Sequence, residues 1–193
     1  MIYLLAVIGG YLLGSVPFGI VITRAMGLGD LRQIGSKSIG ATNVLRTGNK
    51  GAALATLILD SGKGGIAVLV ASALLSPTVG PIAGLAAFVG HCYPVWLNFR
   101  GGKGIATLLG ILLALNFWAG LAACGTWLAV AVISRISSVS GMSAALSAPI
   151  FLAAFGRWDA VLAACFMAGL VIWRHQENIK RLMAGVEPRI GKK

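Results

Sequence analysis

The chain has 193 residues, of which 58% are hydrophobic and 11% are charged, and its formal net charge is +11. Soluble domains carry about 25% charged residues, so this composition excludes an ordinary water-soluble globular protein. The positive charge does not indicate nucleic-acid binding, because cationic loops are a regular feature of one side of membrane proteins. We therefore expect an all-α, polytopic integral membrane protein, surrounded by lipid, in which residues 1–193 form a single domain.

Long uncharged stretches predict seven helices. Apolar segments of about 18 or more residues without charges are typical of membrane spans. Pro17 is expected to kink the first helix, since proline lacks the N–H group that an intrahelical hydrogen bond requires. Residues 104–134 in one helix would extend about 46 Å, beyond a hydrocarbon core of roughly 30 Å, so a break near Leu115–Asn116 is expected. The predicted helices cover residues 2–23, 51–76, 84–98, 104–115, 116–134, 138–155 and 158–173.

The distribution of positive charge favours seven spans over six. With seven, residues 24–50, 99–103, 135–137 and the tail from Arg174 share one side, and of the sixteen Lys and Arg residues only Arg157 lies on the other. Six spans would move the tail across the membrane and remove this bias. The positive-inside rule then predicts an N-terminus outside and a C-terminus in the cytoplasm. The first helix is predicted to be retained, because it lacks the basic region and cleavage site of a signal peptide.

The cysteines and histidines do not form the pattern of a metal site. Cys92, Cys124 and Cys165 lie in apolar segments without paired spacing, so buried free thiols are expected. His91 and His175 are far apart in the sequence, and no ligand cluster surrounds either one. We therefore predict no metal and no cofactor.

The first polar loop, residues 35–46, combines glycines, short hydroxyl side chains and cations. Glycines allow successive backbone N–H groups to turn toward an anion. The alternative is a solvated interfacial loop with ordinary turn residues. The candidate phosphate-binding residues here are Gly35, Ser36, Ser38, Gly40, Thr42, Asn43 and Arg46, with Lys37 as a further cation.

The second polar loop, residues 99–103, runs directly into an apolar helix. Glycines followed by a helix N-terminus favour phosphate binding, because unpaired N–H groups and the helix dipole both point to the ligand. The spacing is not that of a Walker A motif, because Lys103 is followed by glycine rather than Ser or Thr. The alternative is a basic anchor that only fixes topology. The candidate residues are Gly101, Gly102, Lys103, Gly104 and Thr107.

A third polar element follows the last predicted span. His175 and Asn178 are three residues apart and would share one face of a helix, whereas Glu177 would point elsewhere. These two side chains are candidates for binding a polar substrate, although His175 could equally cap carbonyls at a helix end. Inside the second span, Asp60 and Lys63 are also three apart, and a buried ion pair is the first interpretation. A substrate role for Lys63 stays open.

Together these motifs resemble the bacterial acyl-phosphate:glycerol-3-phosphate acyltransferases of the PlsY type, over nearly the whole chain. One departure is that Lys37-Ser38 stand where the family commonly has Gly-Asn. The matching stretches are Tyr11-Leu12-Leu13-Gly14-Ser15-Val16-Pro17-Phe18-Gly19, Gly35-Ser36, Gly40-Ala41-Thr42-Asn43, Leu59-Asp60, Lys63-Gly64, Gly90-His91, Tyr93-Pro94-Val95, Gly101-Gly102-Lys103-Gly104-Ile105-Ala106-Thr107, and His175 with Glu177-Asn178-Ile179.

The resemblance implies a seven-helix enzyme of the bacterial cytoplasmic (inner) membrane with its active site on the cytoplasmic face. Its reaction would move a fatty acyl group from acyl phosphate to the 1-hydroxyl of glycerol 3-phosphate, giving lysophosphatidic acid and phosphate. This is the first acylation of phospholipid synthesis, which links the protein to an acyl-phosphate-producing enzyme and a second acyltransferase. The implied catalytic and substrate-binding residues are Ser36, Arg46, Lys103, His175 and Asn178, with Asp60, Lys63, His91 and Glu177 as supporting candidates.

The sequence lacks the usual patterns of a protein base. Acyltransferases often place an Asp five residues after a catalytic His, but here Trp96 follows His91 and Lys180 follows His175 at that spacing. No serine–histidine–acid signature is present either. We therefore expect a substrate-assisted reaction in which a phosphate oxygen of the donor takes the proton. The main rival is an organic-phosphate transporter, which would need cations along a pore, and a third class is a lipid-binding scaffold.

Overall fold

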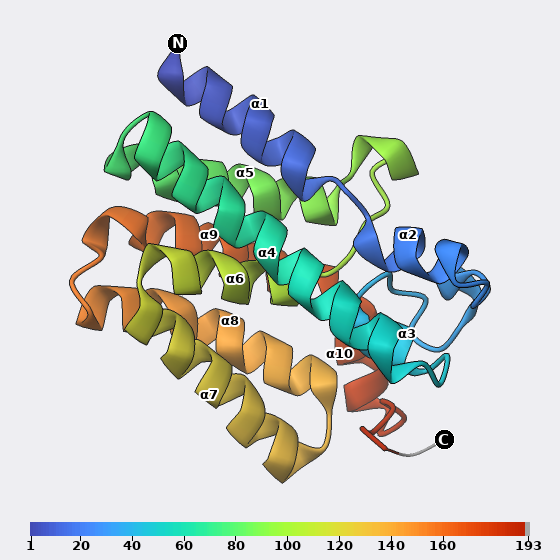
Figure 1. The fold of residues 1–193 in the computed structure, drawn as a ribbon. Helices are drawn as coiled ribbons and strands as arrows, with labels where there is room; N and C mark the ends of the chain where they lie inside the picture. Colours follow the sequence, from blue (N-terminus) through green and yellow to red (C-terminus); the bar gives the residue numbers. More distant parts are fainter. Residues whose placement is uncertain (192–193) are drawn as a thin grey trace.

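The computed structural model describes residues 1–191, and within that range it contains helices and no β-strand (Figure 1). The α-helices are α1 (Ile2–Gly14), α2 (Phe18–Ala25), α3 (Ala41–Leu45), α4 (Lys50–Leu74), α5 (Gly80–Cys92), α6 (Ile105–Leu115), α7 (Phe117–Ser134), α8 (Ser137–Ala154), α9 (Trp158–Arg174) and α10 (Gln176–Met183). Short 3-10 helices cover Leu31–Gln33, Pro77–Val79 and Val95–Leu97.

The all-α membrane architecture is confirmed. Within residues 1–191, five helical segments are long and apolar enough to cross a membrane: Ile2–Ala25, Lys50–Leu74, Pro77–Leu97, Phe117–Ser134 and Ser137–Ala154. Helices α6 and α9 are also apolar but shorter, with 11 and 17 residues. Large apolar side chains such as Ile133 and Leu162, 84% and 83% exposed, cover the outside of the bundle, as expected for a surface that faces lipid. The count of seven spans and the orientation of the termini stay predictions.

Both predicted interruptions are present. The first span is divided between α1 and α2 at Pro17, and the run from 104 to 134 is divided at Asn116. Asn116 caps α7, because its side-chain oxygen accepts a hydrogen bond of 2.9 Å from the Ala119 N–H. The predicted limits of the third helix were wrong. Helix α5 starts at Gly80, since Pro81 sits in its first turn, where the missing N–H costs nothing, and it ends at Cys92 ahead of Pro94.

The helices pack closely where glycines face a neighbouring backbone. A Cβ atom on Gly14 of α1 would lie 2.0 Å from the Ala87 carbonyl oxygen of α5, and one on Gly110 of α6 would lie 2.0 Å from that of Ser61 in α4. Only glycine permits these approaches. The fully buried core between the helices includes Phe88, Leu108, Ile111, Leu112, Leu152 and Met167.

The polar segments gather at one end of the bundle. In Figure 1, α2, α3 and α10 lie together at the end that also holds the C-terminus, away from the N-terminus. Hydrogen bonds join segments that are distant in sequence: Thr42 to Ser137 at 3.2 Å, and the Ile190 N–H to the Arg135 carbonyl at 2.6 Å. Three of the segments that the charge pattern placed on one side are thus in direct contact.

Candidate active site

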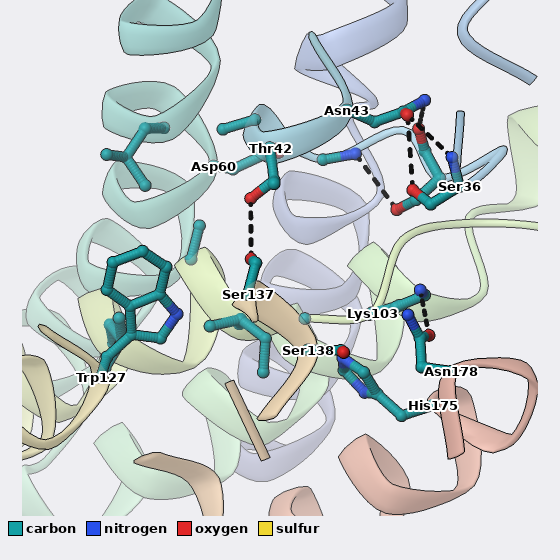
Figure 2. A pocket seen from close by; sticks show the side chains of 18 of the residues that line it. Ser36, Thr42, Asn43, Asp60, Lys103, Trp127, Ser137, Ser138, His175 and Asn178 are labelled. Atoms are coloured by element: carbon teal, nitrogen blue, oxygen red, sulfur yellow. Dashed lines mark hydrogen bonds between the residues drawn. The ribbon is translucent and has the colours of Figure 1, made fainter. Parts of the chain in front are cut away.

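A cavity of about 290 Å³ lies at this polar end (Figure 2). It brings together residues from all three polar elements of the sequence and from the buried part of α4. The candidates that line it are Ser36, Ser38, Gly40, Thr42, Asn43, Arg46, Asp60, His91, Lys103, Gly104, His175 and Asn178. Sequence reasoning missed the other lining residues, which are Ala41, Leu57, Ile105, Ala106, Leu109, Cys124, Trp127, Ser137, Ser138, Glu187 and Pro188.

Asn43 fixes the shape of the first loop. Its side chain is 1% exposed, and its Nδ2 atom donates to the carbonyls of Leu31 at 2.9 Å and Ser38 at 2.7 Å. Its Oδ1 atom accepts from the Ser36 N–H at 3.1 Å and lies 3.4 Å from the Ser36 hydroxyl. Since both amide hydrogens are used inside the loop, Asn43 acts on a ligand indirectly, by presenting Ser36 to the cavity (Figure 2).

Position 35 requires glycine, because its backbone is in the left-handed region and the Arg46 side chain lies close to it. It has a φ of +50°, and a Cβ atom there would lie 2.6 Å from the Arg46 side chain. Arg46 itself follows the short helix α3 and lines the cavity. Gly40 precedes α3, and its N–H lies 3.4 Å from the Ser38 hydroxyl. The first loop therefore offers the cavity one guanidinium group and several hydroxyl groups.

The second loop is built differently from the expected nest of N–H groups. The Gly101 N–H donates to the Cys92 carbonyl at 3.1 Å, and the Gly102 N–H donates to the His91 carbonyl at 3.0 Å. Their own carbonyls accept from Arg174, at 2.8 Å for Gly101 and 3.2 Å for Gly102. These two glycines therefore hold the loop against α5 and α9, and their N–H groups are not directed at an anion.

The start of α6 is arranged as the sequence predicted, with a glycine before the helix and the helix N-terminus at the cavity. Gly104 precedes the helix with a φ of +85°, and its carbonyl accepts the first intrahelical bond from the Leu108 N–H at 2.7 Å. The N–H groups of the first turn have no acceptor within the helix. Ile105 and Ala106 of that turn line the cavity, so the positive end of the α6 dipole points to it. Thr107 instead is fully buried, where it packs beside Gly64 of α4.

Lys103 is held by a chain of polar contacts. Its Nζ atom donates to Asn178 Oδ1 at 2.5 Å, and Asn178 Nδ2 donates to Glu187 Oε1 at 2.5 Å. Glu187, only 6% exposed, also accepts from Ser138 at 2.7 Å and from Arg181 at 2.7 Å. The carboxylate thus connects α8, α10 and the tail. Glu187 lies in a basic, polar tail, and nothing in the sequence pattern indicated that it belongs to the site.

The ionisable groups outside the helical spans have shifted pKa values. Burial, together with the neighbouring charge of Arg181, lowers the pKa of Lys103 to about 8. Burial lowers the pKa of His175 to about 4, so the imidazole is neutral at pH 7. Burial acts to raise the pKa of Glu187, but the hydrogen bonds from Ser138, Asn178 and Arg181 outweigh it and the net shift is downward.

His175 combines the two roles that the sequence left open. Its Nδ1 atom lies 2.7 Å from the Val171 carbonyl oxygen, one turn back in α9. A carbonyl only accepts, so Nδ1 carries the hydrogen and Nε2 is an acceptor. His175 and Asn178 are both 3% exposed and line the cavity, as the predicted shared face requires. Glu177 points away, as predicted, and pairs with Lys180 at 2.9 Å.

The ion pair within the membrane is confirmed. Lys63 Nζ lies 2.7 Å from Asp60 Oδ1 and donates to the Val16 carbonyl at 2.8 Å, beside the break between α1 and α2. His91 Nδ1 is 3.7 Å from the same carboxylate, and Gly102 packs on the His91 ring. Asp60 and His91 line the cavity and Lys63 does not, so Lys63 has a structural place behind the site.

Neither a metal cluster nor a disulfide is found in the part of the chain that the structure describes. No group of three or more His, Cys, Asp or Glu side chains comes together within residues 1–191. All three cysteines are free, but the expectation that all are buried was wrong. Cys92 is buried, Cys124 is half-buried on the cavity wall, and Cys165 is exposed on the outer face of α9, where lipid rather than protein covers an apolar residue.

The fold and the site agree with one family. The model of the glycerol-3-phosphate acyltransferase family matches residues 4–185, nearly the whole chain. The chain therefore belongs to this family, which makes it a membrane-embedded acyltransferase of phospholipid biosynthesis.

Individual relatives support this assignment. The chain is similar to a glycerol-3-phosphate acyltransferase of Cereibacter sphaeroides, 60% identical over 184 residues, with 95% of this chain and 88% of the relative covered. The corresponding protein of Maricaulis maris is 54% identical over 193 residues, covering 100% of this chain and 89% of the relative.

Two crystal structures of PlsY, an integral membrane glycerol 3-phosphate acyltransferase, have the same fold. Its glycerol 3-phosphate form superposes with a TM-score of 0.92 at 40% identity, covering 98% of this chain and 96% of that one. Its lysophosphatidic acid form superposes with a TM-score of 0.90 at 38% identity, covering 98% and 95%.

Proposed function

We propose that this protein transfers a fatty acyl group from acyl phosphate to the 1-hydroxyl of glycerol 3-phosphate, releasing lysophosphatidic acid and inorganic phosphate. The relatives named for glycerol 3-phosphate acylation, and the PlsY forms with glycerol 3-phosphate and lysophosphatidic acid, support the acceptor and the product. The choice of acyl phosphate as donor rests on the resemblance of the motifs and on the chemistry of the cavity.

The observation that carries this proposal is the two-part lining of the cavity. One part is polar and cationic, with Lys103, Arg46 and Ser36, and the other is apolar, with Leu57, Leu109 and Trp127. Figure 2 shows Trp127 on the opposite side of the cavity from Lys103, Asn178 and His175. A substrate with a phosphate group at one end and an acyl chain at the other matches this lining. The apolar part is formed by residues of α4, α6 and α7, and α4 and α7 also carry exposed apolar side chains such as Leu54 and Leu128 on their outer faces.

In the proposed mechanism the protein holds two phosphate-bearing substrates and stabilises charge. Lys103, Arg46 and the N-terminus of α6 bind phosphate oxygens, and they balance the negative charge that grows as the acyl–phosphate bond breaks. Ser36 donates a hydrogen bond to the same region. His175 accepts a hydrogen bond from a glycerol hydroxyl through Nε2, which orients the attacking oxygen.

The proton goes to the donor itself. The 1-hydroxyl oxygen of glycerol 3-phosphate attacks the acyl carbon, and the bond from that carbon to the phosphate oxygen breaks. The hydroxyl proton is taken by an oxygen of the departing phosphate, so the products are an ester and hydrogen phosphate. Burial lowers the pKa of His175 to about 4, which disfavours the imidazole as the acceptor of this proton.

The same proposal includes the membrane arrangement. Seven spans, an outside N-terminus and a cytoplasmic active site would put the polar end of the bundle in the compartment that holds soluble glycerol 3-phosphate. A bacterial cytoplasmic membrane is the proposed location, with an acyl-phosphate-producing enzyme before this step and a second acyltransferase after it. The transporter alternative has less support, because the cations of the cavity, Arg46 and Lys103, both lie at its polar end.

The test is phosphate release by the purified protein in detergent. Palmitoyl phosphate is supplied with and without glycerol 3-phosphate, and palmitoyl-CoA replaces it in a parallel reaction. We expect phosphate and lysophosphatidic acid in equal amounts, only when both substrates are present, and loss of both products in Lys103→Ala and Ser36→Ala. Equal turnover with palmitoyl-CoA would refute the donor assignment. No turnover from a folded protein would refute the reaction.

A further inference from the structure

A second cavity adjoins the first on the side of α9 and α10. It has a volume of about 330 Å³ and shares Ser36, Ser38 and Lys103 with the first cavity. Its other lining residues are Lys37, Gly101, Trp173, Arg174, Gln176, Glu177 and Arg181. Most of these residues belong to polar loops and to the amphipathic helix α10, so this cavity faces water rather than lipid.

The charge of the second cavity is not balanced by its own residues. It has four cations, Lys37, Lys103, Arg174 and Arg181, and one carboxylate, Glu177, which pairs with Lys180 outside the cavity. Arg181 is compensated by Glu187 at 2.7 Å. Arg174 and Lys103 are not, because they bond to neutral groups.

Neutral hydrogen-bond partners hold Arg174 and Lys103 in place without neutralising their positive charges. Arg174 donates to the carbonyls of Gly101 and Gly102, and its guanidinium lies 5.1 Å from the centre of the Tyr93 ring. Lys103 donates to the amide oxygen of Asn178. Both positive charges therefore remain available to attract an anion into this cavity.

Lys37 lines this cavity, is exposed, and has a backbone conformation that suits glycine. Its φ is +56°, and its N–H donates to the Ile34 carbonyl at 2.9 Å, which closes a tight turn. A side chain in this left-handed region costs conformational free energy that glycine would avoid. Lys37 is exposed, and within residues 1–191 no carboxylate forms an ion pair with it.

We propose that the second cavity is a water-side anion site through which phosphate monoester dianions reach Lys103, and that Lys37 is its entrance cation. The inference deepens the proposed function and rests on it, because glycerol 3-phosphate would be the incoming dianion and inorganic phosphate the outgoing one. Ser36, Ser38 and Lys103, which line both cavities, would pass the phosphate group from one to the other. Lys37 does not touch the reacting atoms and sets affinity rather than chemistry.

The proposed role of Lys37 can be measured through its dependence on salt concentration. A cleft lined by one sign of charge raises the local concentration of the opposite ion, and the effect weakens as salt is added. The screening length is about 30 Å at 0.01 M salt and about 3 Å at 1 M. A contribution from Lys37 therefore appears at low salt and disappears at high salt, whereas a direct catalytic contact would persist.

The experiment compares Lys37→Gly, Lys37→Arg and wild type in phosphatidylcholine nanodiscs. Binding of glycerol 3-phosphate and of inorganic phosphate is measured by calorimetry, and KM and kcat by phosphate release. We expect Lys37→Gly to weaken both affinities and raise KM about threefold at 0.01 M salt, with kcat unchanged and no difference at 1 M. Lys37→Arg should bind like wild type. The unfolding temperature of Lys37→Gly should be equal or higher, since glycine suits the turn, which separates a lost charge from a damaged fold.

Lys50→Gln is the matched control, because Lys50 is exposed at the start of α4 and lines neither cavity. Unchanged affinities in Lys37→Gly at low salt, or an equal effect in Lys50→Gln, would overturn the inference. So would an effect that appears only in nanodiscs containing phosphatidylglycerol, which would assign Lys37 to lipid headgroups. Wild-type protein without turnover would refute the proposed function, while the calorimetric comparison would still decide the role of Lys37.

Discussion

The Nζ atom of Lys103 lies 2.5 Å from the Oδ1 atom of Asn178, although the two residues are 75 positions apart in the sequence. One comes from the loop before α6 and the other from α10, so this contact joins two of the three polar elements at the centre of the site. Asn178 is neutral, so it directs the ammonium group without cancelling its charge. Lys103 is therefore held ready for a phosphate group, and four predictions concern it and its surroundings.

Removing Lys103 should abolish most of the activity. We expect Lys103→Met to lower kcat/KM by about 100-fold or more, since a preorganised cation acting on developing charge is lost. Because the pKa of Lys103 is about 8, its charge is present below that pH and lost above it, so kcat/KM of wild type should fall as the pH rises through about 8. Lys103→Arg, which does not titrate in this range, should lack this fall. A wild-type profile that stays flat to pH 10 would contradict the assignment.

His175 should affect rate without adding a titration near neutrality. We expect His175→Ala to lower kcat by about 10- to 100-fold, because the attacking hydroxyl loses the acceptor that orients it. The phosphate group of the substrate has a second pKa near 6, so the rate should change with pH near that value. This change should be the same in wild type and variant. Stopped assays across pH 5 to 9 measure both profiles. Disappearance of a limb in the variant alone, with a loss of several orders of magnitude, would make His175 the base and rule out substrate assistance.

Glu187 should stabilise the site in a pH-dependent way. We expect Glu187→Gln to cost about 1–3 kcal/mol of stability at pH 7, because a side-chain amide replaces a buried acceptor of three hydrogen bonds. Since its pKa is lowered in the folded protein, the carboxylate contributes fully above the pKa of the unfolded chain, and this contribution is lost as the pH falls through the folded value.

The measurement for Glu187 is the unfolding temperature of both proteins in detergent at pH 7 and at acid pH. The gap between wild type and Glu187→Gln should narrow on acidification. A constant gap would mean that the substitution acts through packing alone. Arg189→Gln is the matched control, because Arg189 is an exposed tail residue that lines neither cavity.

The pair of Asp60 and Lys63 should matter for stability more than for chemistry. We expect Lys63→Met to cost about 3–5 kcal/mol, because it leaves the Asp60 carboxylate buried without its cation. The double variant Asp60→Asn/Lys63→Met should recover part of this loss, since neither charge remains. Chemical denaturation of the three proteins measures the coupling. If the single variant were as stable as wild type and merely inactive, Lys63 would belong to the substrate site after all.

Hydropathy and charge predicted much of the fold, because both act locally. The break at Asn116 followed from the length of a helix that a bilayer can contain, and the structure places an asparagine cap there. The predicted start of the third helix at residue 84 was wrong for a local reason too: α5 already begins at Gly80, because Pro81 is tolerated in the first turn of a helix. The grouping of Ser36, Lys103 and His175 in one cavity was anticipated only through the family resemblance, since no periodicity relates three separate loops.

The remaining parts of the site depend on contacts that sequence patterns do not encode. The N–H groups of Gly101 and Gly102 were expected to face an anion, but the end of α5 lies close enough to accept both hydrogen bonds. Glu187 is the clearest omission. It is one acidic residue in a basic tail, and only the folding of that tail between α8 and α10 makes it the shared acceptor of Ser138, Asn178 and Arg181.

The position of Glu187 also has a consequence for the order in which the walls of the site are synthesised. The tail that carries Glu187 and Pro188 forms the last wall of the cavity, and the Ile190 N–H ties it to the Arg135 carbonyl beyond α7. All the helices that the structure describes precede these residues in the sequence, so this wall is synthesised after them. We therefore expect a stop codon after Gly185 to produce a protein that still inserts into the membrane but lacks this wall of the cavity and loses activity.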